Sequence, residues 1–157
     1  MTLDAEVAVV GYGPGGNTLA ILLAQLVRSV VVPERRPGPY PLPRAVHFDH
    51  EAGRILRACG IGEELRSITV CQWHNDSGTT LMRFGRGGHS SSGWPLSSMF
   101  NQSALEDPLD RRARSLPGTE VRRRMEVAAL EQSSEDVTLH TAGADKARAP
   151  QLQGGRS

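Results

Sequence analysis

Three glycines near the start of the chain have the spacing of a phosphate-binding turn. In the run VAVVGYGPGGNTLA, Gly11, Gly13 and Gly16 form G-x-G-x-x-G, and Pro14 and Gly15 complete the turn. The first glycine permits a tight turn, the second lets the backbone approach a pyrophosphate, and the third lets a helix pack closely on a strand. The N–H groups at the start of that helix favour bound phosphate. We therefore predict that these five residues bind a dinucleotide.

The segments on either side of the turn predict a Rossmann-like βαβ unit. Glu6–Val10 predicts a buried strand, Thr18–Leu26 predicts a helix, and Val30–Val32 starts a second strand that ends near Glu34. An acid at Glu34 can accept hydrogen bonds from ribose hydroxyls and disfavours a 2′-phosphate, so we expect FAD or NAD rather than NADP. The alternative is a glycine-rich turn in an unrelated α/β fold.

The rest of the chain does not continue as a simple βα repeat. His50–Ala58 predicts a helix ended by Gly60, and Thr69–Phe100 predicts an antiparallel hairpin followed by a loop. The other expected elements are a helix at Ser103–Ser115 and strands at Glu120–Arg123, Glu126–Leu130 and Val137–Thr141. Residues 142–157 contain no apolar run, so we expect them to be irregular.

Two longer runs resemble the flavoprotein aromatic-ring monooxygenases. They are PYPLPRAVHFDHEAGRIL from Pro39 and SGWPLSSMFNQSALEDPLDRRARSLPGTEVRR from Ser92, and they are most similar to the 3-(3-hydroxyphenyl)propionate hydroxylase group. The resemblance implies an α/β fold: an incomplete Rossmann-like FAD-binding domain over residues 1–141 with an inserted antiparallel β segment. It implies FAD as the cofactor. The residues that it assigns to FAD, beside the glycine turn, are Glu34, Arg35, Arg44 and Gln102.

The resemblance also implies an activity for the full-length protein. In such enzymes NAD(P)H reduces the FAD, and O2 then supplies one oxygen atom to a phenolic ring. We expect this sequence to be the N-terminal FAD-binding part without the substrate domain, with its catalytic residues unknown and with no hydroxylase activity on its own. NAD(P)H and a phenolic substrate are expected as partners only of a full-length relative. The alternatives are a stand-alone nucleotide-binding module, a half completed by a separate C-terminal chain, and an inert product.

Local chemistry agrees with some of these assignments and leaves others open. Arg44 follows a proline-stiffened loop, which suits a guanidinium held against a diphosphate, although a solvated loop arginine has the same pattern. Gln102 opens a helix, where a polar residue needs no further function. His47, Asp49 and His50 are too few to define a metal site, so we predict no metal, and we expect Asp49 to cap the following helix. The Arg44 and Gln102 segments disfavour an NAD-dependent reductase.

The composition excludes several other classes. With 18 Lys and Arg against 17 Asp and Glu, the charge gives no reason to expect nucleic acid or an anionic membrane as a partner. Cys59 and Cys71 are too few for a disulfide framework, and no apolar run approaches the roughly 18 residues of a membrane span. We expect a cytoplasmic protein with Trp73, Trp94 and Phe100 in its core.

Four positions depart from the family pattern. Val27 stands at the end of the first helix, where the relatives carry glycine, and a left-handed backbone there would cost on the order of 1–2 kcal/mol. Pro33 removes a donor from the second strand, and Pro108 lies inside a helix, where proline costs roughly 3 kcal/mol. Gln153 replaces the aspartate of an Asp-Gly motif, and we expect the segment before it not to form a buried strand.

Overall fold

The computed structural model describes residues 2–26, 28–41, 45–61, 66–67, 69–142 and 146–150. The chain divides into two compact units. The first comprises Met1–Pro41 and Glu106–Ser157, and the second comprises Leu42–Leu105.

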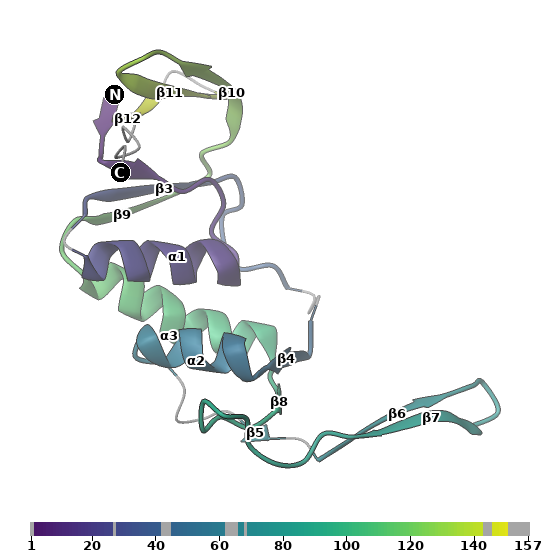
Figure 1. Cartoon of the computed structure of the whole chain (residues 1–157). Helices are drawn as coiled ribbons and strands as arrows, with labels where there is room; N and C mark the ends of the chain where they lie inside the picture. The colour runs from purple at the N-terminus through teal and green to yellow at the C-terminus, as the bar shows by residue number, and fades with distance from the viewer. Residues whose placement is uncertain are drawn as a thin grey trace. The chain divides into compact units, whose positions relative to one another are not determined.

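A parallel three-stranded sheet lies in the first unit (Figure 1). Its strands are β2 (Val7–Ala8), β3 (Val30–Glu34) and β9 (Thr119–Arg123), in the order β2-β3-β9. The three valines of β3 are at most 1% exposed, which agrees with a central strand covered on both faces. The predicted second strand is therefore confirmed.

Pro33 lies in this central strand, where it removes one donor from the ladder. Its carbonyl oxygen accepts a hydrogen bond from the Gly11 nitrogen at 2.9 Å, and that of Val31 accepts from Val9 at 2.9 Å. In a regular parallel ladder the nitrogen at position 33 would donate back to Val9, but proline has no hydrogen to donate. Accordingly β2 ends at Ala8, although the chain runs beside β3 as far as Gly11.

Helix α1 (Pro14–Gln25) begins four residues before the start that the apolar pattern predicts, at Pro14 rather than Thr18. Pro14 suits the first helical position, because its ring presets φ and no intrahelical partner exists there for an N–H. The helix lies against β3 and β9 (Figure 1). Its buried face consists of Asn17, Ala20, Ile21 and Ala24. The expectation for Val27 falls outside the described residues.

A four-stranded sheet, also in the first unit, has the order β1-β12-β11-β10. Its strands are β1 (Thr2–Asp4), β10 (Val127–Gln132), β11 (Asp136–Thr141) and β12 (Lys146–Pro150). β12 pairs parallel to β1 and antiparallel to β11, and β10 and β11 form an antiparallel pair.

Strand β12 differs from the expectation that the chain is irregular after residue 141. Its sequence, KARAP, has no apolar run and so carries little strand signal of its own. Pairing on both edges, with Ala147 opposite Leu3 and Leu139, gives its backbone groups the partners that make an extended segment stable. The expectation for Gln153 falls outside the described residues.

Helix α3 (Gln102–Ser115) contains the predicted interior proline. Leu105, Leu109 and Ala113, spaced at four-residue intervals, are 6%, 0% and 0% exposed and form a buried stripe along the helix. Pro108 lies beyond the first turn, so it donates no hydrogen bond to the carbonyl four residues earlier. The burial of this stripe offsets the cost of the proline.

The second unit contains an antiparallel sheet, a helix and a hairpin. The sheet has the order β4-β8-β5, and β6 pairs with β7. The elements are β4 (His47–Asp49), α2 (His50–Ala58), β5 (Arg66–Ser67), β6 (Val70–His74), β7 (Thr80–Gly85) and β8 (Ser97–Met99). The predicted helix and hairpin are both confirmed.

The aromatic residues of this unit do not all pack as expected. Phe100 is half-buried with its ring centroid 5.2 Å from that of Phe48, and Trp94 is half-buried against Gly53. Trp73, however, is 58% exposed and lies in β6, so its assignment to the core is wrong. Figure 1 shows the ribbon that β6 forms with β7. The Trp73 ring packs edge-on against that of Phe84. The side chain stays exposed because the described residues place no second layer over the ribbon.

Both ends of α2 are capped as the sequence predicts. The Asp49 carboxylate accepts a hydrogen bond from the Ala52 nitrogen at 3.0 Å. At the other end Gly60 has a φ of 83° and donates to the Arg57 carbonyl at 2.8 Å. These contacts satisfy backbone groups that a short helix leaves without partners.

Replacing Asp49 by alanine is expected to lower the free energy of unfolding by about 1 kcal/mol at neutral pH. The Ala52 N–H holds the pKa of Asp49 below its ordinary value. The cap therefore stabilises fully above about pH 4, and this contribution is lost as the pH falls through the lowered pKa. Urea denaturation of wild type, Asp49→Ala and the neutral cap Asp49→Asn at neutral and acid pH tests this. Equal neutral-pH stability of wild type and Asp49→Ala would contradict it.

Replacing Pro108 by alanine is expected to raise the free energy of unfolding by about 1–3 kcal/mol, because α3 regains a hydrogen bond and loses a steric clash. Asp107→Ala, at the exposed neighbouring position, is the matched control and should change stability by less than about 1 kcal/mol. Thermal and urea unfolding followed by circular dichroism would measure both. A Pro108→Ala protein less stable than wild type would show that the proline is required in this helix.

Candidate functional site

The glycine turn connects the end of the parallel sheet to the start of α1. Gly11 has a φ of 96°, a conformation that residues with a side chain rarely adopt, and it turns the chain away from β3. Gly13 is the N-cap residue of α1, with φ −74° and ψ −177°. No side chain caps this helix, and its first turn contains no acidic residue. The start of α1 therefore keeps its positive partial charge for an anion.

Gly16 permits the closest backbone approach in the turn. A Cβ atom at this position would lie 2.1 Å from the carbonyl oxygen of Gly11 and 3.6 Å from Cγ1 of Val9. Any side chain would therefore push α1 away from the strand that precedes it. This is the close helix–strand packing that the spacing of the three glycines predicts.

Neither packing against the described residues nor backbone conformation requires glycine at positions 13 and 15. A Cβ atom added at either position would meet no atom within 4 Å, and neither residue has a positive φ. Space beside Gly13 is thus open. The open space at Gly13 and the uncapped start of α1 fit the phosphates of a dinucleotide.

Glu34 lies at the carboxyl end of β3 and is bound to the glycine turn. Its Oε2 accepts a hydrogen bond from the Tyr12 nitrogen at 2.7 Å, and its Oε1 accepts from the Arg36 nitrogen at 2.8 Å. The carboxylate is half-buried, and each oxygen retains acceptor capacity for a further hydroxyl. The structure therefore brings together the turn and the acid that the sequence assigns to a ribose.

The other three predicted residues are not brought to this turn by the described contacts. Arg35 follows Glu34 and is exposed, and Arg44 lies outside the described residues. Gln102 belongs to the second unit and is 6% exposed at the first position of α3. Asn101 caps that helix by accepting a hydrogen bond from the Ala104 nitrogen at 3.1 Å, so the cap does not explain Gln102.

Sequence reasoning missed a cluster around Tyr12, the residue between the first two glycines. The Tyr12 side chain is buried, with the residue 4% exposed, and the Arg123 guanidinium lies 5.2 Å from its ring centroid. Asp110 of α3 is 3.5 Å from Arg123 and 2.9 Å from Arg114. Burial, followed by the charge of Asp110, holds the pKa of Tyr12 above its ordinary value, so its hydroxyl stays neutral.

No sequence motif marks this cluster. Tyr12 occupies a variable position of G-x-G-x-x-G, and Arg123 is one of three consecutive arginines, Arg122 to Arg124. The period of two along the predicted strand at Glu120–Arg123 places Arg123 and Val121 on one face. This periodicity predicts the face of β9 on which Arg123 lies. It does not predict that Arg123 contacts Tyr12, which comes from a distant part of the chain.

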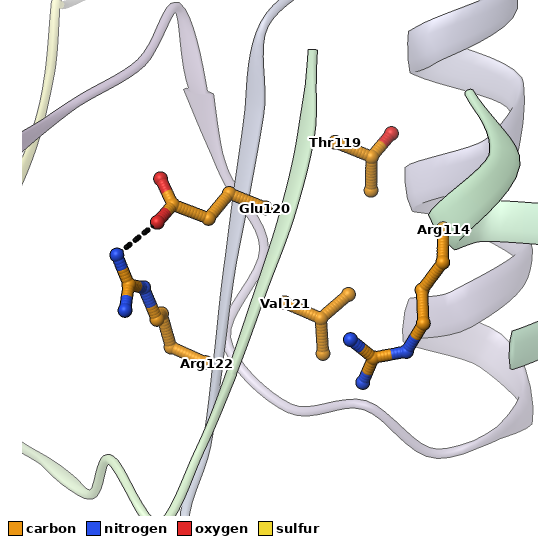
Figure 2. Close-up of a pocket in the computed structure, with 5 residues that line it drawn as sticks. All are labelled: Arg114, Thr119, Glu120, Val121 and Arg122. Carbon is orange, nitrogen blue, oxygen red and sulfur yellow. Dashed lines mark ion pairs between the residues drawn. The ribbon is translucent and has the colours of Figure 1, made fainter. Parts of the chain in front are cut away.

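A hollow along β9 does not belong to this site. Figure 2 shows Thr119 and Val121 on the side of the strand that faces Arg114, with Glu120 and Arg122 on the opposite side. Glu120 and Arg122 form an ion pair with each other. The hollow thus follows the edge of a strand, and none of its lining residues is among the predicted FAD residues.

The described part of the chain contains neither a metal cluster nor a membrane-spanning helix. Among those residues, no group of three or more His, Cys, Asp or Glu is arranged to hold a metal ion. Of the polar residues near α2, Asp49 caps the helix and the His47 Nε2 bonds the Ser97 hydroxyl. No described helix combines the length and apolar composition needed to cross a bilayer.

Comparison of the sequence with known proteins identifies a family. Residues 4–151 match the family described as FAD binding domain. A probable NADH-specific resorcinol 4-hydroxylase of Rhodococcus jostii is 40% identical over 138 residues, which are 85% of this chain and 26% of that protein. A 3-(3-hydroxy-phenyl)propionate/3-hydroxycinnamic acid hydroxylase of Burkholderia vietnamiensis is 34% identical over 144 residues, 89% of this chain and 26% of the relative. The chain spans about a quarter of the length of these relatives.

Two solved structures share the fold of this chain. The p-nitrophenol 4-monooxygenase PnpA of Pseudomonas putida superposes with a TM-score of 0.81 at 24% identity, over 94% of this chain and 39% of that one. The flavin-dependent monooxygenase PieE, solved with FAD and substrate, superposes with a TM-score of 0.79 at 21% identity, over 94% and 29% of the two chains. The predicted α/β fold, the predicted family and FAD as its cofactor are confirmed.

Replacing Gly16 by alanine is expected to lower the free energy of unfolding by about 1–3 kcal/mol, because the new Cβ has no room against the Gly11 carbonyl. Gly15→Ala is the matched control one residue earlier in the same helix. It should leave stability unchanged or raise it by up to about 1 kcal/mol, since its Cβ meets open space. Urea denaturation would measure both, and equal stability of the two variants would refute the close packing.

Proposed function

We propose that this chain, which belongs to the FAD-binding domain family, binds FAD through its glycine turn and Glu34. The pyrophosphate would lie at the N-terminus of α1, on N–H groups that no side chain caps. The Glu34 carboxylate would accept hydrogen bonds from the ribose hydroxyls, since two backbone donors already hold it in place. In such a site the chain binds and orients the cofactor, and the bound FAD supplies the redox chemistry.

The open space at Gly13 carries this proposal. The described residues surrounding Gly13 would tolerate a side chain, and its φ of −74° suits any residue. Gly38 and Gly85 also have open space for a Cβ, so the openness of Gly13 supports a ligand through its place at the uncapped start of α1. The uncapped helix start beside Gly13 and the Glu34 carboxylate, which accepts from the Tyr12 nitrogen, support an anion with hydroxyl groups as the ligand, and a dinucleotide is such a molecule.

We further propose that the whole protein is a monooxygenase that hydroxylates phenolic rings with NAD(P)H as electron donor. The names of the relatives support the substrate class, since they include a resorcinol hydroxylase and a hydroxyphenylpropionate hydroxylase. In that protein Arg35, Arg44 and Gln102 would complete the FAD site. We propose the cytoplasm as its location, because NAD(P)H is available there.

A nucleotide-binding module without catalysis is the second candidate. The chain contains the turn and the acid for FAD, but no described residue has a role at the reacting ring. This candidate predicts FAD binding without hydroxylation, whether the chain acts alone or together with a completing C-terminal chain. Activity measured with NADH, O2 and resorcinol, with and without such a chain, separates it from the first candidate.

Titration of the purified chain with FAD tests the site directly. We expect saturable quenching of flavin fluorescence, with NAD as the control ligand. Gly13→Ala should raise the dissociation constant for FAD by about tenfold or more, because the methyl group occupies ligand space. Its free energy of unfolding should stay within about 1 kcal/mol of wild type, since the methyl group meets nothing within the chain.

Gly85→Ala is the matched control, because Gly85 also has open space for a Cβ and lies on the β6–β7 ribbon. It should bind FAD as wild type does. Equal FAD affinity of wild type and Gly13→Ala would show that the turn is not the pyrophosphate site. A folded wild-type chain that binds no FAD would overturn the proposed function of the chain itself.

A further inference from the structure

Three parallel strands bring their carboxyl ends to one edge of the sheet in the first unit. β2 leads into the glycine turn, β3 ends at Glu34, and β9 ends at Arg123. Glu34 and Arg123 are direct neighbours in the register of β3 and β9. Ligands of open α/β sheets bind outside the carboxyl ends of the strands. Arg123 is therefore the residue that β9 contributes to the carboxyl edge of the sheet, where we propose that FAD binds.

The contacts of Arg123 point to the glycine turn. Figure 2 shows Thr119 and Val121 on the side of β9 that faces Arg114, and the period of two in a strand puts Arg123 on that side as well. There its guanidinium lies 5.2 Å from the centroid of the Tyr12 ring and 3.5 Å from the Asp110 carboxylate. The side chain is 20% exposed, so water weakens these attractions less than at an open surface.

The backbone after β9 holds Arg123 in this position. Arg124 has a φ of 64°, the one left-handed residue other than glycine in the described part of the chain. The next nitrogen, that of Met125, donates to the Glu34 carbonyl at 3.0 Å. The chain after β9 is thus bound to the end of β3. A non-glycine residue in this conformation persists where surrounding contacts require it.

We propose that Arg123 is a positioning residue for the FAD site, which holds Tyr12 and, through Tyr12, the glycine turn in the conformation that receives the pyrophosphate. The link from side chain to site is the Tyr12 backbone, whose nitrogen donates to Glu34 at 2.7 Å between two residues of the turn. A more mobile Tyr12 ring would loosen both the glycine turn and Glu34, the carboxylate that we propose binds the ribose. This inference rests on the proposed FAD binding.

Amide hydrogen exchange and FAD titration of Arg123→Gln test the inference. We expect exchange of the Tyr12 amide to accelerate and FAD to bind more weakly, each by about threefold to thirtyfold, the range equivalent to one cation–π contact. Arg123→Lys keeps the charge without the planar face and should fall between wild type and Arg123→Gln. Arg111→Gln, which removes an exposed arginine of α3, is the matched control and should change neither quantity.

Amide exchange at Val31, in the buried strand β3, reports on global stability and so distinguishes a positioning role of Arg123 from a general stabilising one. Equal acceleration at Tyr12 and Val31 in Arg123→Gln would reduce Arg123 to a stabilising residue and overturn the proposal. Unchanged exchange at Tyr12, or unchanged FAD affinity, would overturn it as well. If wild type binds no FAD, the proposed function fails, and unchanged Tyr12 exchange would then also refute the hold of Arg123 on the turn.

Discussion

The contact between Gly16 and the Gly11 carbonyl is the constraint on which the rest of this site depends. With 2.1 Å between a Cβ at position 16 and that oxygen, only glycine lets α1 start directly behind the end of β2. This placement leaves the first N–H groups of α1 at the carboxyl edge of the sheet without a capping side chain. The phosphate site that we propose therefore depends on one close backbone approach.

Charged side chains from two neighbouring strands lie at the same edge of the sheet. Glu34 comes from the end of β3 and Arg123 from the end of β9, and the two are register partners. Tyr12 connects them, because its nitrogen donates to Glu34 while its ring lies beside the Arg123 guanidinium. Pro33 interrupts only one rung of the ladder, so these ends remain aligned. Parallel strands make this arrangement possible, since all of their carboxyl ends meet at one edge.

Sequence patterns predicted those features of the fold that depend on residues close together in the chain. The cap at Asp49, the end of α2 at Gly60 and the proline within α3 each depend on a few neighbouring residues. Predictions failed where the cause is distant. Trp73 was expected in the core, but burial needs a second layer, which the described residues do not place over its ribbon. The strand at Lys146–Pro150 owes its form to β1 and β11 rather than to its own residues.

The sequence by itself determined the family, the cofactor class and the glycine turn for which we propose phosphate binding, because the spacing of glycines and the acid after a strand are requirements of backbone geometry. Only the tertiary structure decided which residues support that turn. Tyr12, Asp110 and Arg123 are separated along the chain and have no common motif. They meet because β9 pairs with β3 of the first βαβ unit and Asp110 of α3 lies beside Arg123, and contacts of this kind leave no periodic signal in a single sequence.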